Sequence, residues 1–316
     1  MNLSNLILFI NSFLISFAFF KLSKPVFKKY LLSKPNIRST HQSPTPQGAG
    51  IIFAICSSVY GYLDGSFLFL FCLPIAIIGM IDDLYNLSRK LRYLSHLVIS
   101  GLIVSHYLDL FISREYFLIY ICVFLLLTFI STVFINLTNF MDGLDGLVSG
   151  CMLISFTLIM LSSDINLLPL LGPLLSFTIF NWPPAKIFMG DAGSTFLGLT
   201  YFVSILSLGK YSLLLAFTLI NIPMYGDALV CLIRRLLTGQ NIFRAHRLHS
   251  YQRLYLAGWN KTRISLFYIL NTLFLSLIFY IWGINLLIIF SVVVIILGFY
   301  VDIKYSSPFN SFGENS

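Results

Sequence analysis

Charged residues are scarce in this sequence, and its cysteines show no pairing pattern. Lys, Arg, Asp and Glu together make up 10% of the 316 residues, against about a quarter in an ordinary soluble domain. The five cysteines lie singly in apolar stretches with no C-x-x-C pair, which argues against a disulfide framework or a zinc site. With 58% hydrophobic residues, a chain of this length cannot bury its apolar surface as one soluble domain. A single soluble globular domain is therefore excluded.

Apolar stretches long enough to cross a membrane occupy most of the chain. A bilayer core needs about 20 apolar residues per helix, with a lower limit near 17. We predict an all-α polytopic membrane protein with about 11 transmembrane helices. No internal repeat or linker is visible, so residues 1–316 are expected to form a single integral membrane domain. The predicted spans are 3–20, 48–63, 66–81, 94–111, 117–135, 146–161, 167–181, 194–208, 212–231, 264–281 and 284–301.

The basic residues fall on one side of this arrangement. All of the twenty Lys and Arg residues except Arg114 and Lys210 lie in the connections after odd-numbered spans or in the C-terminal tail. The positive-inside rule makes that side cytoplasmic, with the N-terminus outside and the C-terminus cytoplasmic. The formal net charge of +8 suits contact with anionic lipid headgroups or anionic substrates.

The acidic residues on the cytoplasmic side gather in three short loops, the first of which begins with Asp82 and Asp83. Acids at a membrane boundary are costly and indicate function. Adjacent carboxylates repel, so keeping both ionised calls for a nearby cation. If the third span continues as a helix, Asp82, Asn86 and Lys90 share one face, which combines metal-binding with phosphate-binding groups. The alternative is a solvated helix end with ion pairs.

The second loop is dense in amide and acid side chains. Asn136, Asn139, Asp142 and Asp145 place polar groups in a small volume. Gly143 and Gly146 permit close approach of a ligand. The alternative is a turn in which these residues are ordinary helix caps.

The third loop leads through Lys186 to Gly190-Asp191-Ala192-Gly193-Ser194 and then into a helix. Free backbone N–H groups at a helix N-terminus suit a phosphate, and Asp191 could hold a cation that bridges to it. The alternative is a capping turn.

The long loop after the ninth span is basic. It carries Arg244, His246, Arg247 and His249. The two histidines could bind zinc, but no third ligand is obvious nearby, and phosphate contact through imidazole and guanidinium is favoured. The alternative is a basic loop lying on lipid headgroups. Asp227 is expected to pair with the arginines of this region.

Taken together, the motifs resemble the polyprenyl-phosphate N-acetylhexosamine-1-phosphate transferase family, glycosyltransferase family 4. The resemblance covers about residues 40 to 255, and the motifs stand in the family's order. Its last motif differs from the three consecutive histidines of the phospho-MurNAc-pentapeptide translocase. It looks like the O-antigen-initiating branch that acts on bacillosamine-type, fucosamine or quinovosamine nucleotides. The matching pieces are Asp82-Asp83 with Asn86, Asn139–Gly146, Phe188–Ser194 and His246-Arg247-Leu248-His249.

The resemblance implies transfer of an N-acetylamino-sugar 1-phosphate from a UDP-sugar to undecaprenyl phosphate, with release of UMP, in the bacterial inner membrane with the active site facing the cytoplasm. It implies Mg²⁺, with Mn²⁺ as an alternative, and catalytic Asp82, Asp83 and Asp191, of which Asp191 and Asp83 bind the metal. Partners are the UDP-sugar, undecaprenyl phosphate and membrane lipids, without nucleic acid, and a homodimer is left open. The predicted substrate-binding residues are Asn86, Lys90, Asn136, Asn139, Asp142, Asp145, Lys186, Arg244, His246, Arg247 and His249.

Two other functions fit some of the same features. A secondary transporter would place acids near the midplane on broken helices, often with internal repeats. An intramembrane magnesium-dependent prenyltransferase would also hold a diphosphate, but on two DxxxD-type loops. The loops found here instead read DD, DGxDG and GDxGS.

Overall fold

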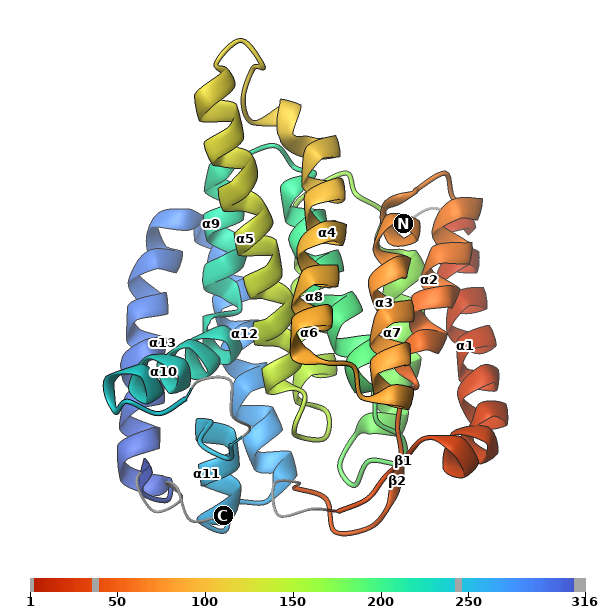
Figure 1. The fold of residues 1–316 in the computed structure, drawn as a ribbon, viewed down its shortest axis with the longest axis vertical. Helices are drawn as coiled ribbons and strands as arrows, with labels where there is room; N and C mark the ends of the chain where they lie inside the picture. The colour runs from red at the N-terminus through yellow and green to blue at the C-terminus, as the bar shows by residue number, and fades with distance from the viewer. Residues whose placement is uncertain (1–2, 36–39, 242–245, 310–316) are drawn as a thin grey trace.

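The computed structural model describes residues 3–35, 40–241 and 246–309, and this part of the chain is almost entirely helical (Figure 1). A single pair of two-residue strands, β1 and β2, accompanies the helices. In chain order the elements are α1 (Leu3–Tyr30), β1 (Leu32–Ser33), β2 (Thr45–Pro46), α2 (Gly50–Leu63), α3 (Leu68–Tyr85), α4 (Arg89–Tyr107), the 3₁₀ turn η1 (Leu108–Leu110), α5 (Phe117–Met141), α6 (Leu147–Leu161), α7 (Leu168–Asn181), α8 (Gly190–Leu206), α9 (Tyr211–Ile220), α10 (Ile222–Leu237), α11 (Ser250–Leu256), α12 (Lys261–Trp282) and α13 (Ile284–Tyr305).

The helices identify a multi-pass membrane protein. Within the described residues, α1, α3, α5, α12 and α13 are each long and apolar enough to cross a bilayer. The pair α9 and α10 adds a sixth candidate if the two are counted as one bent span. Each of the eleven predicted spans coincides with helical structure, several of them with shorter helices. The number of crossings and the orientation of the termini stay predictions.

One predicted span is not a continuous helix. The stretch 212–231 breaks at Asn221, and α9 and α10 meet there at an angle of 80°. Pro223 lies in the first turn of α10, where its missing N–H and fixed φ suit a helix start but not a helix interior. The span was predicted from apolar content, which is insensitive to this break.

The short helix α8 is the centre of the molecule. Every residue of α8 except Asp191 is buried, and the helix packs against α3, α5 and α2. A helix that is apolar on all sides belongs in a protein interior. Asp191, in its first turn, is therefore the point where the centre of the fold meets a polar site.

Small residues allow α3 and α2 to approach α8 closely. A Cβ atom on Gly79 of α3 would lie 2.5 Å from the carbonyl oxygen of Asp191, and one on Gly50 of α2 would lie 2.1 Å from Cα of Gly193. Contacts of backbone against backbone are typical of glycine positions at helix interfaces in membranes. The contact at Gly79 brings the last turn of α3 beside the first turn of α8.

The two strands fasten a loop at the same end of the molecule. Leu32 pairs with Pro46 and Ser33 with Thr45 in an antiparallel register. Phe188 then donates its N–H to the carbonyl of Pro46 at 2.8 Å, which joins the strand pair to the loop between α7 and α8. Figure 1 shows β1, β2 and α11 at the end of the bundle where α3, α5 and α7 finish and α4, α6 and α8 begin.

The packing at Gly79 predicts a stability loss for Gly79→Ala. The added methyl group meets backbone rather than a flexible side chain, so α3 and α8 must separate, at a cost of about 1–3 kcal/mol. Thermal unfolding of the purified protein in detergent should show a lower midpoint. Gly298→Ala in α13 is the control, because a Cβ there meets nothing within 4 Å. Equal midpoints for the two variants would contradict a close contact at Gly79.

Candidate active site

Asp83 caps the N-terminus of α8 from the neighbouring helix α3. Its carboxylate accepts the N–H of Asp191 at 3.0 Å and the N–H of Ala192 at 3.2 Å, and it also accepts Nε2 of Gln47 at 2.6 Å. A carboxylate at this place satisfies otherwise unpaired donors and interacts favourably with the helix dipole. Gly190 makes room, because a Cβ there would lie 2.3 Å from an oxygen of Asp83.

This cap corrects one expectation from the sequence. The first N–H groups of the helix that follows Gly190 were predicted to be free for a phosphate. Two of them are already occupied by Asp83. The sequence alone could not reveal this, because the capping group comes from a residue more than a hundred positions earlier.

Arg92 forms hydrogen bonds with two acids on either side of Asp83, namely Asp82 and Asp191. Its Nη1 donates to Asp82 at 2.9 Å and to Asp191 at 3.2 Å. Asp82 is buried and also accepts the N–H of Leu87 at 2.7 Å. Of the two adjacent acids, Asp82 therefore has a cation in this structure, a guanidinium from α4, whereas Asp83 is held by N–H groups. Sequence reasoning counted Arg92 only as a loop charge.

The connection that carries Arg92 is not the continuous helix that was considered. The helix α3 ends at Tyr85, Asn86 takes a left-handed conformation with φ of 52°, and Ser88 caps α4. Asp82, Asn86 and Lys90 thus do not share a helix face. Asn86 and Lys90 are both exposed. Asn is among the residues that adopt positive φ most readily, which makes it a helix terminator here.

Asn139 links Asp191 to the helix α5. Its Nδ2 donates to Oδ1 of Asp191 at 2.7 Å and lies 2.9 Å from the hydroxyl of Ser194. Asn136, one turn earlier on α5, instead donates to the carbonyl of its own helix at Thr132. Of the three asparagines predicted to bind substrate, Asn86, Asn136 and Asn139, Asn139 is the one that lines the acid-rich cavity.

The two aspartates of the DGLDG segment have different surroundings. Asp145 is buried, accepts the N–H of Ala185 at 3.0 Å and pairs with Lys261 of α12 at 2.9 Å. The carboxylate of Asp142 is half-buried and has no hydrogen bond or ion pair with any residue of the described ranges. Burial raises the pKa of Asp142 well above its usual range, and the nearby charges of Asp191, Asp83 and Asp145 raise it further. Asp142 is the carboxylate that a bound cation or ligand would stabilise most.

These groups line a polar cavity of about 200 Å³, which adjoins a more open one of about 450 Å³. The two share Thr40, His41, Asp145 and Phe188, so they form one continuous site of a size suited to a small-molecule ligand. The polar residues of the inner cavity include Gln47, Asn139, Asp142, Asp145, Asp191 and Gln252. Lys261, Asn260 and Tyr255 line the outer one.

The donor set fits a hard divalent cation. Mg²⁺ takes oxygen ligands, usually one or two carboxylates together with substrate phosphates. Asp142 offers a carboxylate with no competing partner among the described residues, and Asp191 faces the same cavity. Asp83 has less capacity, because three N–H groups already occupy its oxygens, which leaves about one of roughly four lone-pair positions.

The remaining predicted residues lie at the edges of this site. Lys186 is exposed in the loop between α7 and α8. Arg244 lies outside the described residues. His246 and Arg247 are half-buried, whereas His249 is buried at the start of α11. The low polarity around His249 lowers its pKa to about 3, so its imidazole is neutral at pH 7.

Comparison with known proteins places this site in a family. A model described as Glycosyl transferase family 4 matches residues 66–209. A Bacillus subtilis (strain 168) protein named probable undecaprenyl-phosphate N-acetylglucosaminyl 1-phosphate transferase is 28% identical over 297 residues, which cover 83% of this chain and 82% of that protein. The Escherichia coli (strain K12) undecaprenyl-phosphate alpha-N-acetylglucosaminyl 1-phosphate transferase is 30% identical over 283 residues, 80% of this chain and 77% of the relative.

A third relative carries a different name. The phospho-N-acetylmuramoyl-pentapeptide-transferase of Lactococcus lactis subsp. cremoris (strain MG1363) is 28% identical over 298 residues, 79% of this chain and 89% of the relative. Relatives of both names thus align along most of their length. The chain belongs to glycosyl transferase family 4, among the polyprenyl-phosphate N-acetylhexosamine-1-phosphate transferases, as its motifs predicted.

Proposed function

We propose that this protein transfers an N-acetylamino-sugar 1-phosphate from a UDP-sugar to undecaprenyl phosphate, giving undecaprenyl-diphosphate-sugar and UMP. The family and the names of the relatives support this reaction. The observation that carries the proposal is that Asp142 and Asp191, from separate elements, line one polar cavity at the end of a membrane helix bundle, with Asp83 capping the helix that carries Asp191. Such a cavity can receive an anionic head group while a prenyl chain stays in the lipid.

The acids and amides of the cavity would place the donor. Asp191 is our proposed metal ligand, with Asp142 beside it and the last lone pair of Asp83 as a further contact. Mg²⁺ bound there would neutralise the diphosphate and the charge that develops during transfer. Asn139 and Arg92 hold the Asp191 carboxylate in place from α5 and α4. Asp145, fixed by Lys261, shapes the wall shared by the two cavities.

The chemistry itself asks little of a general acid or base. An oxygen of the lipid phosphate forms a bond to the sugar-side phosphorus, and the bond from that phosphorus to the oxygen of UMP breaks. A phosphate monoester has its second pKa near 6, so the acceptor is mostly dianionic at pH 7 and UMP leaves without a strong acid. Asp82 and Asp83 are therefore proposed to act by positioning. Their hydrogen bonds to Arg92, Gln47 and the start of α8 support that role.

The donor sugar and the glycan are the finer part of the proposal. The segment Ala245-His246-Arg247-Leu248-His249 replaces a run of three histidines, which favours a donor for O-antigen or a related surface glycan over the peptidoglycan precursor. The proposed location is the bacterial inner membrane, with the site on the cytoplasmic side, where the basic loops lie. Contact of Arg244 and Arg247 with the diphosphate remains a prediction. The same contact by the imidazoles of His246 and His249 also remains a prediction.

One assay tests the reaction. Purified protein in detergent is supplied with undecaprenyl phosphate, Mg²⁺ and a panel of UDP-N-acetylamino sugars, with UDP-MurNAc-pentapeptide as a separate donor, and UMP is measured. We expect UMP only when acceptor and metal are both present, and none from the pentapeptide donor. No UMP from any N-acetylamino-sugar donor would overturn the proposal and favour a transporter or a prenyltransferase.

Asp142→Asn should separate activity from stability. The carboxylate has no partner in the described structure, so its loss costs no contact and removes repulsion among four acids. We expect an unfolding midpoint equal to or above that of the parent, and a fall in UMP release of at least about 100-fold. Asp164→Asn, at an exposed acid outside the cavity, is the matched control and should change neither quantity. An Asp142→Asn variant with full activity would remove Asp142 from the site.

The pH dependence of Asp83→Asn distinguishes positioning from base catalysis. If Asp83 only positions, the ratio of variant to parent rates stays constant between pH 6 and pH 9. If it removes a proton from the lipid phosphate, the variant recovers as pH rises, because the acceptor then ionises without help. We expect a constant ratio in initial-rate measurements. A labelled acyl-phosphate trapped without acceptor would contradict direct transfer.

Lys261→Met should destabilise the protein by removing the cation that pairs with buried Asp145. Breaking a buried ion pair from one side typically costs about 3–5 kcal/mol, and Asp145 is only 3% exposed whereas Lys261 is 19% exposed, so the lower end is expected. The measurement is the unfolding midpoint. Combining Lys261→Met with Asp145→Asn should recover part of the loss, since no unpaired charge is then buried; an additive double variant would argue against the pair.

A further inference from the structure

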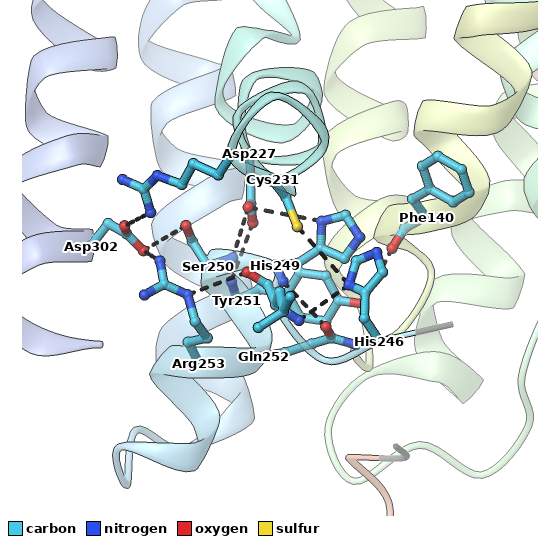
Figure 2. Close-up of polar contacts among 12 residues, drawn as sticks. Phe140, Asp227, Cys231, His246, His249, Ser250, Tyr251, Gln252, Arg253 and Asp302 are labelled. Atoms are coloured by element: carbon cyan, nitrogen blue, oxygen red, sulfur yellow. Dashed lines mark hydrogen bonds and ion pairs between the residues drawn. The ribbon is translucent and has the colours of Figure 1, made fainter. Parts of the chain in front are cut away.

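A cluster of one thiol and two imidazoles lies outside the acid-lined cavity. Cys231 comes from α10, and His246 and His249 come from the segment that leads into α11 (Figure 2). One side-chain ligand atom from each of the three residues lies within 4.8 Å of the other two. Sγ of Cys231 is 4.0 Å from Nδ1 of His246, and the two imidazole rings are centred 5.0 Å apart. Metal-binding side chains thus converge from two separate elements.

His249 has a polar atom without a hydrogen bond. Its side chain is buried, and its Nδ1 has no hydrogen-bond partner among the described residues. Oδ1 of Asp227 lies 4.0 Å from this nitrogen. A buried nitrogen left in this way is costly, and such groups in folded proteins usually have a partner. A ligand between His249 and its neighbours would supply one.

Asp227 is a buried carboxylate with no Lys or Arg partner in the part of the chain that the structure describes. It lies one helical turn before Cys231, so the two side chains project from the same face of α10. It accepts N–H groups from Ser250 and Tyr251 and the hydroxyl of Tyr268. Among the described residues, no Lys or Arg lies within ion-pair distance of Asp227.

An arginine expected to pair with Asp227 contacts another acid. Arg234 pairs with Asp302 of α13, and so does Arg253, whose pair with Asp302 is labelled in Figure 2. For the arginines that the structure describes, the expected pairing with Asp227 was wrong; Arg244 lies outside the described residues. A metal cation can therefore pair with the Asp227 carboxylate in place of Lys or Arg.

Sulfur and nitrogen donors favour a metal different from the one proposed for the cavity. Mg²⁺ prefers oxygen ligands, whereas thiolate and imidazole suit Zn²⁺ and similar transition metals. In tetrahedral zinc sites with bonds of about 2.0–2.3 Å, the ligand atoms lie roughly 3.3–3.7 Å apart. The atoms of this cluster would have to close by about 1 Å, a movement within reach of side-chain rotation.

We propose that Cys231, His246 and His249 bind a divalent transition metal of the zinc class, with the Asp227 carboxylate beside the site as the balancing negative charge. On binding, the Cys231 thiol releases its proton to solvent and forms the sulfur–metal bond as a thiolate. Thiolate and carboxylate together balance the two positive charges, so the occupied site is neutral, which suits its burial. In the sequence, no third ligand was obvious near the two histidines. In the structure, Cys231 of α10 supplies one.

The metal would tie the segment before α11 to α10. That segment leads directly to Tyr251, whose hydroxyl bonds to the carbonyl of Phe140 at 3.2 Å, and to Gln252, which lines the inner cavity. The site would therefore fix one wall of the proposed active site, and His246 and His249 would bind the metal in place of their predicted contact with the diphosphate. It does not depend on the proposed function.

Metal analysis tests the proposal directly. Full-length protein carrying a tag without histidines is purified in detergent under reducing conditions, and its zinc is measured by mass spectrometry. Cobalt is then titrated into the metal-free protein and followed by absorption. We expect about one zinc ion per chain, and with cobalt a thiolate charge-transfer band together with the visible bands of a tetrahedral site.

Substitutions locate the metal. Cys231→Ser, nearly identical in shape, should abolish the charge-transfer band and weaken zinc binding at least about 10-fold, and His246→Ala should weaken it similarly. Cys151→Ser, at a buried cysteine of α6, is the control and should keep both. Asp142→Asn should also keep the zinc while losing transferase activity, so the two proposals fail separately. Absence of bound metal from the folded parent, or an unchanged cobalt spectrum in folded Cys231→Ser, would overturn the proposal.

Discussion

The capping of α8 by Asp83 is the interaction on which the site depends. It needs three things at once: a carboxylate on the last turn of α3, free N–H groups on the first turn of α8, and a contact between the two helices without side chains at Gly79 and Gly190. Together they bring Asp82 and Asp191 within reach of one guanidinium, that of Arg92, with Asp83 between the two helices. Without this arrangement the acids would be separate charges at a membrane surface.

The fold could be predicted from the sequence to the extent that burial decides it. Runs of apolar residues predicted the positions of the helices correctly, because each crossing needs about 20 apolar residues close together in the sequence. The break at Asn221 and the end of α3 at Tyr85 were not predicted. Both depend on single residues, Pro223 and Asn86, whose effects disappear in an average over a window.

The site could be predicted in part for a similar reason. Acids are rare in this chain, so Asp82, Asp83, Asp142, Asp145 and Asp191 stood out, and their order along the chain identified the family. Their partners did not stand out. Lys261 and Arg92 are two of twenty basic residues, and Gln47 is an ordinary polar residue in a turn-rich stretch. Which basic residue meets which acid depends on how the helices are rotated, and one sequence carries no signal for that.

The burial of α8 has a consequence for how the protein meets its lipids. Helices that face lipid tilt or shift when the bilayer becomes thicker or thinner, because their apolar length must match its core. α8 has protein on every side and ends well within the bundle, so it has no apolar surface to match. Asp191, at its first turn, is thereby shielded from hydrophobic mismatch, and bacteria could change membrane composition with temperature or growth phase without displacing this carboxylate.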